Sequence, residues 1–252
     1  GATRKLLFRA VAALHDGPFD VDLYGAHVRL HPRHNVSERK ALMRPDRMDP
    51  REHAMVRAAM RAEGAVLVDV GANAGLYSLD AALNAGPGAT ILSIDPNPAL
   101  LARLAFNAET ARGEGRIAPG VRMIAAPVAI SDRDGTGVLT GGADEGSRTL
   151  EGTGHGQTVA LRALAGLIAE HAITRVDVMK IDVEGHEDKV LPPFLATAPA
   201  ALWPRLVVIE HLARSRWTVD CIALAEAKGY AVRLVTPNNT VLERSGASAI
   251  TI

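Results

Sequence analysis

The stretch AVLVDVGANAGLYSL, at residues 65–79, constrains the fold of this chain more than any other part of it. It is an apolar run of buried-strand character that ends in an acid, turns through small residues and opens into a helix. In an open parallel α/β sheet, this order places backbone groups from the carboxyl end of the first strand at a ligand crevice. Gly71 and Gly75 remove side chains where a ligand approaches the backbone closely.

The acid in this turn indicates the kind of ligand. A dinucleotide pyrophosphate binds bare N–H groups at a helix N-terminus, and a fixed carboxylate beside it would repel it. Asp69 therefore suits a ligand with a cationic part, such as the amino group of S-adenosylmethionine (AdoMet). A second apolar run ends at Asp95, where an acid can accept hydrogen bonds from both hydroxyls of a ribose. Asn73 can cap the first helix or contact the cofactor, because both roles need a small polar side chain.

Four blocks of the sequence resemble the FkbM family of AdoMet-dependent methyltransferases. They are VDVGANAGLYS (68–78), SIDPNPALLARLAFN (93–107), AISDRDG (129–135) and MKIDVEGHE (179–187), in the family's order and spacing. The resemblance covers residues 50–212, and it departs from the family in having Asp95 where glutamate is more usual. We assign cofactor binding to Asp69, Gly71, Asn73, Gly75, Asp95, Pro96, Asn97 and Asp182.

The alternation of strands and helices after residue 64 predicts one α/β domain. The resemblance implies a class I methyltransferase fold, Rossmann-like, with a seven-stranded, mostly parallel sheet, an antiparallel last strand and helices on both faces. We predict strands at 66–70, 90–94, 121–125, 176–181, 205–209, 230–235 and 240–243, the last two joined by a tight PNN turn. We predict helices at 51–63, 76–84, 99–111, 161–171, 187–194 and 219–228.

Two segments lie outside this pattern. Residues 1–50 are expected to be an N-terminal extension that covers the substrate pocket, ahead of a methyltransferase domain at 51–252. Residues 135–156 are rich in Gly, Ser, Thr and Asp and hold few large apolar side chains, so they cannot form core. This segment is either a surface loop or a lid, and residues 136–140 and 158–161 are able to pair as an added hairpin.

The chemistry is expected where the strand at 176–181 ends. Methyl transfer is an in-line displacement, so the protein mainly aligns the acceptor and excludes water, and a hydroxyl acceptor must also lose its proton. We predict that Asp182, His186, Glu210 and His211 form the catalytic set, since a near-neutral imidazole is a natural general base. Lys180 interrupts an apolar strand and must find a partner, which we expect to be one of these acids.

The same residues allow other interpretations. Glu184 and Glu187 are typical of the first turn of a helix, where the helix dipole favours acids. Asp182, Glu184, His186, Glu210 and His211 also resemble a ligand set for magnesium or manganese. Their spacing matches no compact metal motif, and we predict no metal.

Composition narrows the partners. The formal net charge is zero, so no global basic field recruits nucleic acid, and we expect a small-molecule acceptor instead. Arginines near the N-terminus are predicted to lie on solvated helix faces, with an anionic substrate group near Arg33 or Arg39 as the alternative. Cys221 is the single cysteine, so neither an intramolecular disulfide nor a cysteine metal cluster can form. The absence of a long apolar segment or signal peptide predicts a cytoplasmic enzyme without membrane insertion.

We therefore expect an AdoMet-dependent methyltransferase that methylates a hydroxyl on a small molecule, sugar or glycosylated natural product. An NAD-linked oxidoreductase would share the sheet. It is disfavoured because Asp69 stands in the phosphate turn and the GxGxxG pattern is absent. A non-catalytic AdoMet-binding module is the remaining alternative.

Overall fold

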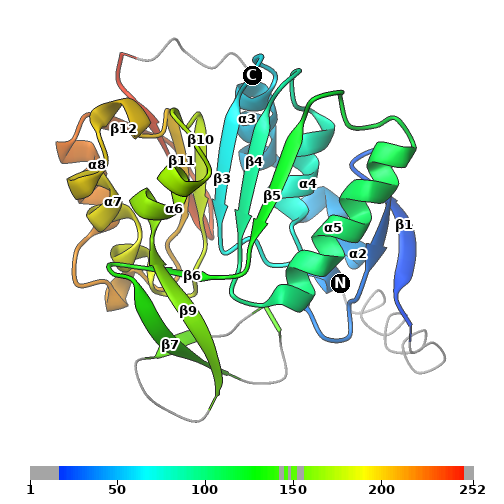
Figure 1. The fold of residues 1–252 in the computed structure, drawn as a ribbon, viewed down its shortest axis with the longest axis horizontal. Coiled ribbons are helices and arrows are strands. Elements are labelled where there is room, and N and C mark those ends of the chain that lie inside the picture. The colour runs from blue at the N-terminus through cyan, green and yellow to red at the C-terminus, as the bar shows by residue number, and fades with distance from the viewer. Residues whose placement is uncertain (1–16, 142–144, 147–148, 152–155, 247–252) are drawn as a thin grey trace.

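The protein is built on one seven-stranded sheet (Figure 1). The computed structural model describes residues 17–141, 145–146, 149–151 and 156–246. The sheet has the order β12-β13-β11-β10-β3-β4-β5, and β13 runs antiparallel to both of its neighbours. Its strands are β3 (Val66–Val70), β4 (Thr90–Ile94), β5 (Arg122–Ala126), β10 (Val178–Ile181), β11 (Leu206–Glu210), β12 (Tyr230–Val235) and β13 (Asn239–Arg244). The predicted class I, Rossmann-like fold with an antiparallel last strand is confirmed.

The central strands are buried on both faces, which explains their nearly continuous apolar sequence. Successive side chains of β3 point to opposite sides, so Leu67 joins one core cluster while Val66 and Val68 join the other. The first cluster is closed by α3 (Pro50–Met60), α4 (Leu76–Leu83) and α5 (Pro98–Gly113). The second is closed by α6 (Leu164–Glu170), α7 (Leu191–Thr197) and α8 (Cys221–Ala227).

Two predicted helices differ from the observed ones. The helix predicted at 161–171 begins at Leu164, because residues 161–163 complete a strand instead. The helix predicted at 187–194 is a short 3-10 turn, η2 (Glu187–Lys189), followed by α7. Pro192 and Pro193 explain the second difference, since proline fits only the first turn of a helix, where its missing N–H is not needed. Further 3-10 turns are η1 (Pro45–Arg47), η3 (Ala200–Leu202) and η4 (Arg214–Arg216).

The described part of the N-terminal extension packs on the main domain. Residues 17–49 contain a hairpin of β1 (Phe19–Leu23) and β2 (Ala26–Leu30), then α2 (Val36–Met43). The hairpin rests on α5: the Arg29 N–H donates to Asn107 Oδ1 over 2.7 Å, and Asn107 Nδ2 donates to the Arg29 carbonyl over 3.1 Å. Val28 and Leu30 are buried in the first core cluster. These residues are therefore part of the core.

A second, four-stranded sheet occupies most of the glycine-rich region. It has the order β6-β9-β7-β8, and Figure 1 shows β7 and β9 projecting away from the central sheet. Its strands are β6 (Ala129–Ser131), β7 (Gly135–Thr140), β8 (Thr149–Glu151) and β9 (Gln157–Ala163). The predicted pairing of 136–140 with 158–161 is confirmed, since β7 and β9 run antiparallel with Gly137 opposite Val159. Residues 142–144, 147–148 and 152–155 of this region lie outside the described residues.

Candidate functional site

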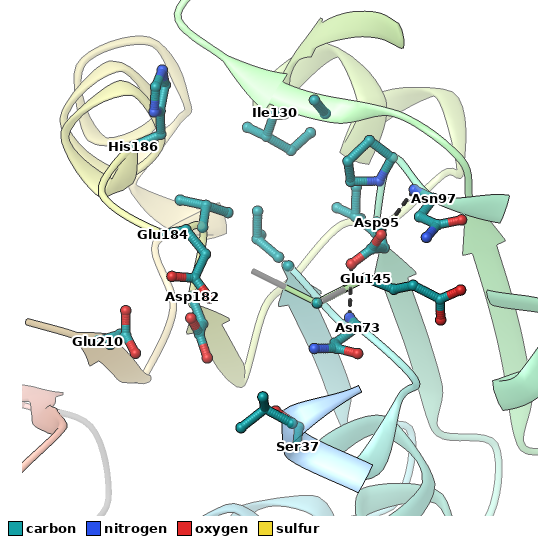
Figure 2. A pocket seen from close by; sticks show the side chains of 18 of the residues that line it. Ser37, Asn73, Asp95, Asn97, Ile130, Glu145, Asp182, Glu184, His186 and Glu210 are labelled. Carbon is teal, nitrogen blue, oxygen red and sulfur yellow. Dashed lines mark hydrogen bonds between the residues drawn. The ribbon is translucent and has the colours of Figure 1, made fainter. Parts of the chain in front are cut away.

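A cavity of about 290 Å³ opens where β3, β4, β10 and β11 end. Figure 2 shows two opposite sides: Asp182, Glu184 and Glu210 on one, and Asn73, Asp95, Asn97 and Glu145 on the other. We call these the Glu210 side and the Asp95 side. The position agrees with the rule that ligands of open α/β sheets bind outside the carboxyl ends of the strands.

The glycine turn forms the floor of this cavity. Gly71 has a φ of 79°, and a Cβ built on it would lie 1.8 Å from the carbonyl oxygen of Asp182. Its N–H donates to the carbonyl of Ile94 over 2.9 Å, so the turn joins the ends of three strands. No side chain fits there, and the floor is bare backbone. Gly75 has another reason to be glycine, because its Cβ would lie 2.5 Å from Leu104 of α5 and Gly75 does not line the cavity.

Asp95 is the most firmly oriented acid of the cavity. The N–H groups of Asn73 and Asn97 donate to its two carboxylate oxygens, each over 2.8 Å. Burial raises the pKa of Asp95 to about 6, although these two N–H groups act in the opposite direction. Pro96 and Asn97 line the cavity beside it, and Asn97 also caps α5 by accepting from the Ala99 N–H. The carboxylate of Asp95 therefore has a fixed orientation at the cavity, with Pro96 and Asn97 beside it.

Asp69 lies beneath the floor and does not line the cavity. It is fully buried, and the Ser78 hydroxyl donates to its Oδ2 over 2.6 Å. Among the described residues, no partner exists for its Oδ1. Burial raises the pKa of this carboxyl, while the ammonium of Lys180, its register partner on β10, acts to lower it.

Lys180 and Asp182 form an ion pair at the end of β10, with 2.9 Å between Nζ and Oδ2. This confirms that Lys180 finds an acid. The ammonium is buried and also lies 5.0 Å from the ring centre of Tyr77. Burial alone would lower the pKa of Lys180, but the nearby carboxylates of Asp182 and Asp69 outweigh it and raise the pKa. Lys180 therefore remains charged and fixes the orientation of Asp182.

The turn after Asp182 is held by a buried acid. Glu187 accepts hydrogen bonds from the N–H groups of Val183 and Gly185, over 3.0 and 3.1 Å, and from the indole N–H of Trp217 over 2.7 Å. Its role is structural, in line with the helix-start interpretation. Glu184 adopts a φ of 56° within this turn and lines the cavity.

The four predicted catalytic residues do not all meet in the cavity. Asp182, His186 and Glu210 line it, whereas His211 does not, and its Nδ1 lies 2.8 Å from the Thr240 hydroxyl. Burial, with the charges of Asp182 and Glu184, raises the pKa of Glu210 to about 8. Burial lowers the pKa of His186, and Figure 2 shows its ring pointing away from Glu210.

Sequence reasoning expected the N-terminal extension to cover the pocket, but it named none of the lining residues there and missed those of the β12–β13 turn. The lining residues are Val36, Ser37, Lys40, Arg47, Met48 and Asp49 from the N-terminal extension, and Asn238 and Asn239 from the β12–β13 turn. The sequence offers little sign of these lining residues, which include polar residues of the β12–β13 turn and of the segment after α2. Only tertiary contacts bring the two segments together.

The glycine-rich region reaches the cavity through Glu145 and Gly146. The Glu145 N–H donates to the carbonyl of His34 over 2.9 Å, and its carboxylate pairs with Arg103 of α5. Arg103 also pairs with Glu38 of α2, at 2.7 Å. Gly146 lies directly on Asn73, since a Cβ there would be 2.2 Å from Asn73 Nδ2. One arginine thus connects this region to α2 and α5 beside Asp95.

Within the described residues, no group of three or more His, Cys, Asp or Glu side chains is arranged to hold a metal ion. Of the five residues considered as a metal set, Asp182 is paired with Lys180, Glu184 and His186 lie in the turn after β10, Glu210 ends β11, and His211 contacts Thr240. In the same part of the chain, no helix is long and apolar enough to cross a membrane.

Comparison with known proteins identifies the family. The Methyltransferase FkbM domain matches residues 69–230. The chain belongs to the FkbM methyltransferase family. A relative in this family is the 31-O-demethyl-FK506 methyltransferase FkbM of Streptomyces tacrolimicus, which is 31% identical over 196 residues, covering 67% of this chain and 74% of the relative. The family resemblance that the four sequence blocks indicated is confirmed.

Solved methyltransferases resemble this chain in fold at low sequence identity. Magnesium protoporphyrin IX methyltransferase (ChlM) from Synechocystis PCC 6803, solved with bound SAM, is 12% identical with a TM-score of 0.47 over 84% of this chain and 85% of its own. Precorrin-6y C5,15-methyltransferase from Geobacter metallireducens GS-15 is 12% identical with a TM-score of 0.42 over 77% of this chain and 89% of its own.

Proposed function

We propose that this FkbM-family chain is an AdoMet-dependent O-methyltransferase whose acceptor is a hydroxyl of a small molecule, a sugar or a glycosylated natural product. The observation that carries this is the arrangement of the cavity. An oriented, buried carboxylate on the Asp95 side faces an acidic wall on the Glu210 side, across a floor of bare backbone. The relative named above is described as acting on 31-O-demethyl-FK506, which supports an oxygen acceptor.

The residues present fit the cofactor. Asp95 is placed to accept hydrogen bonds from the two ribose hydroxyls, because its own backbone contacts fix its orientation. Gly71 leaves space above the floor, and Asn73, Pro96, Asn97 and Asp182 complete the surrounding wall. When bound, AdoMet supplies an electrophilic methyl group on a sulfonium.

Below that floor, Asp69 has an oxygen without a partner among the described residues. When ionised, Asp69 adds its negative charge to that of Asp182 and favours the cationic amino end of the cofactor. Asp69 therefore contributes through the field it exerts. Gly75 contributes by letting α4 and α5 approach, which fixes the helix that follows the turn.

Proton removal from the acceptor is assigned to the Glu210 side. With a pKa of about 8, Glu210 is a stronger base than an ordinary carboxylate and is partly ionised near neutral pH. Asp182 is held by Lys180 and orients the hydroxyl toward the methyl group. His186 also lines the cavity and is the second candidate for the general base. His211 lies outside the cavity lining and is the last candidate.

Two measurements test this function. Calorimetry with AdoMet and with NAD distinguishes a methyltransferase from an oxidoreductase, and we expect binding of AdoMet alone. Incubation with AdoMet and a panel of hydroxylated acceptors, followed by assay of S-adenosylhomocysteine, distinguishes an enzyme from a binding module. AdoMet binding without turnover on any acceptor would favour the module.

A further inference from the structure

Asp49 combines two local features that do not serve the stability of the fold. It is a non-glycine residue in the left-handed region, with φ 43° and ψ 51°. It stands at the position before α3 where an aspartate ordinarily accepts a hydrogen bond from the helix N–H groups, yet its side chain makes no such bond. Strained, uncapped positions of this kind persist where surrounding structure enforces them, and they cluster at functional sites.

Asp49 instead lines the cavity. The Tyr77 hydroxyl donates to its Oδ2 over 3.1 Å. Among the described residues, this is the one hydrogen bond that the side chain of Asp49 makes. Tyr77 is itself fixed, because its ring stacks on His53 with 4.0 Å between ring centres. Burial raises the pKa of Tyr77 well above its ordinary value, so its hydroxyl stays a donor. Asp49 is thus oriented by a rigid neighbour.

A chain of contacts places Asp49 near the Glu210 side. Glu52, one helical turn further along α3, is buried and accepts hydrogen bonds from the Thr236 hydroxyl and from Asn239 Nδ2. Asn239 is the register partner of Glu210 on the neighbouring strand. The start of α3 is therefore tied to the strand end that carries Glu210.

We propose that Asp49 binds the acceptor, accepting a hydrogen bond from a second hydroxyl next to the one that is methylated. This inference rests on the proposed function and adds a property of the acceptor: it carries at least two hydroxyl groups. A carboxylate that accepts from Tyr77 on one oxygen has its other oxygen available for a second donor, and α3, which Asp49 precedes, is tied to the strand end assigned to proton removal. Sequence analysis gave no role to this residue.

The variant Asp49→Gly tests the inference, because glycine accepts the left-handed backbone without strain. Asp46→Gly is the control: it removes a carboxylate three positions earlier, from an exposed residue of η1 that does not line this cavity. The melting temperatures of both variants can be measured without a methyl acceptor. The variant relieves the left-handed strain but leaves the buried Tyr77 hydroxyl without its acceptor, and because these effects oppose each other we expect unfolding within about 4 °C of the wild type. A decrease of more than about 4 °C, absent from the control, would show a structural role and overturn the inference.

Acceptor kinetics provide the second readout. With an acceptor identified by S-adenosylhomocysteine release, Asp49→Gly should raise the KM for that acceptor about tenfold or more, with AdoMet affinity within about twofold of wild type. The wild type should prefer the diol over its singly deoxygenated analogue, and Asp49→Gly should lose this preference. Wild-type KM and preference in the variant would overturn the inference alone. Absence of turnover by the wild type on every acceptor would overturn the proposed function and the inference with it.

Discussion

Replacing Asp95 by alanine tests the cofactor assignment most directly. The substitution removes a carboxylate that we expect to accept two hydrogen bonds from the ribose. Hydrogen bonds to a charged group contribute about 1.5 to 3 kcal/mol, so AdoMet affinity should decrease about ten- to a hundredfold. Calorimetry at pH 7.5 measures the change, and the fold of the variant is checked by circular dichroism.

The pKa of Asp95 adds a pH signature to the same experiment. Because burial raises this pKa from 3.8 to about 6, the ionised form that binds the ribose is depleted below pH 6. Wild-type affinity for AdoMet should therefore decrease as the pH falls through about 6. Asp95→Ala has no carboxyl to protonate, so its weaker affinity should not change over this range.

Stability should move in the opposite direction. A raised pKa in the folded state means that folding favours the neutral carboxyl, so the associated stability is complete below pH 3.8 and is lost as the pH rises through about 6. A shift of about 2 units corresponds to about 3 kcal/mol at most. Asp95→Ala loses the acceptor for the Asn73 and Asn97 N–H groups at every pH, but only the wild type is destabilised by ionisation of Asp95. The free energy of unfolding of the variant should therefore lie further below that of the wild type at pH 5 than at pH 7.5. Urea unfolding at the two pH values measures this.

Two results would refute the reasoning. AdoMet affinity that is unchanged in Asp95→Ala would remove the ribose assignment. A decrease in affinity below pH 6 that persists in the variant would show that another group titrates in the cavity.

Three further predictions follow from the same geometry. Gly71→Val should abolish detectable AdoMet binding in calorimetry and lower the melting temperature, because its Cβ would overlap the Asp182 carbonyl, whereas Gly113→Ala, with open space around it, should change neither. Amide hydrogen exchange in residues 135–156 should slow when AdoMet and acceptor are bound, since Glu145 and Gly146 line the cavity, and equal exchange with and without ligand would indicate a plain surface loop. Glu210→Gln should lower turnover about a hundredfold with AdoMet affinity preserved, and should remove a pH–rate inflection near 8. In the ligand-free protein, Glu210→Gln should become more stable to heat relative to the wild type as the pH rises through about 8, because the folded wild type favours the neutral glutamic acid. An equal difference in melting temperature between variant and wild type at pH 6 and pH 9 would contradict the assignment.

The sequence predicts the central sheet well because parallel strands covered on both faces carry a strong signal. The bounds of β3, β4 and β12 match the predicted ones residue for residue. The β1–β2 hairpin was missed although its signal is present: FDVDL and AHVRL alternate in polarity around Tyr24 and Gly25, both with positive φ.

The sequence predicts the residues of the site that follow the central strands, but not those from distant segments. Asp95 and Asp182 follow strands, and the ends of parallel strands meet at one edge of a sheet, so their proximity is predictable. Asp49 and Asn238 line the same cavity, and Glu52 links their two segments by hydrogen bonds to residues 184 positions or more away. No local pattern encodes such a contact.

The backbone floor at Gly71 has a consequence for how this family member can be redesigned. Because the Asp182 carbonyl lies where a side chain would begin, the floor offers no position to alter. Any change of acceptor preference must therefore come from the walls, and the wall around Ser37, Lys40 and Arg47 is supplied by a segment that precedes the domain's first central strand. A library confined to residues 36–49 would alter this wall, whereas Asp95 and the other residues that we propose to bind AdoMet would stay constant.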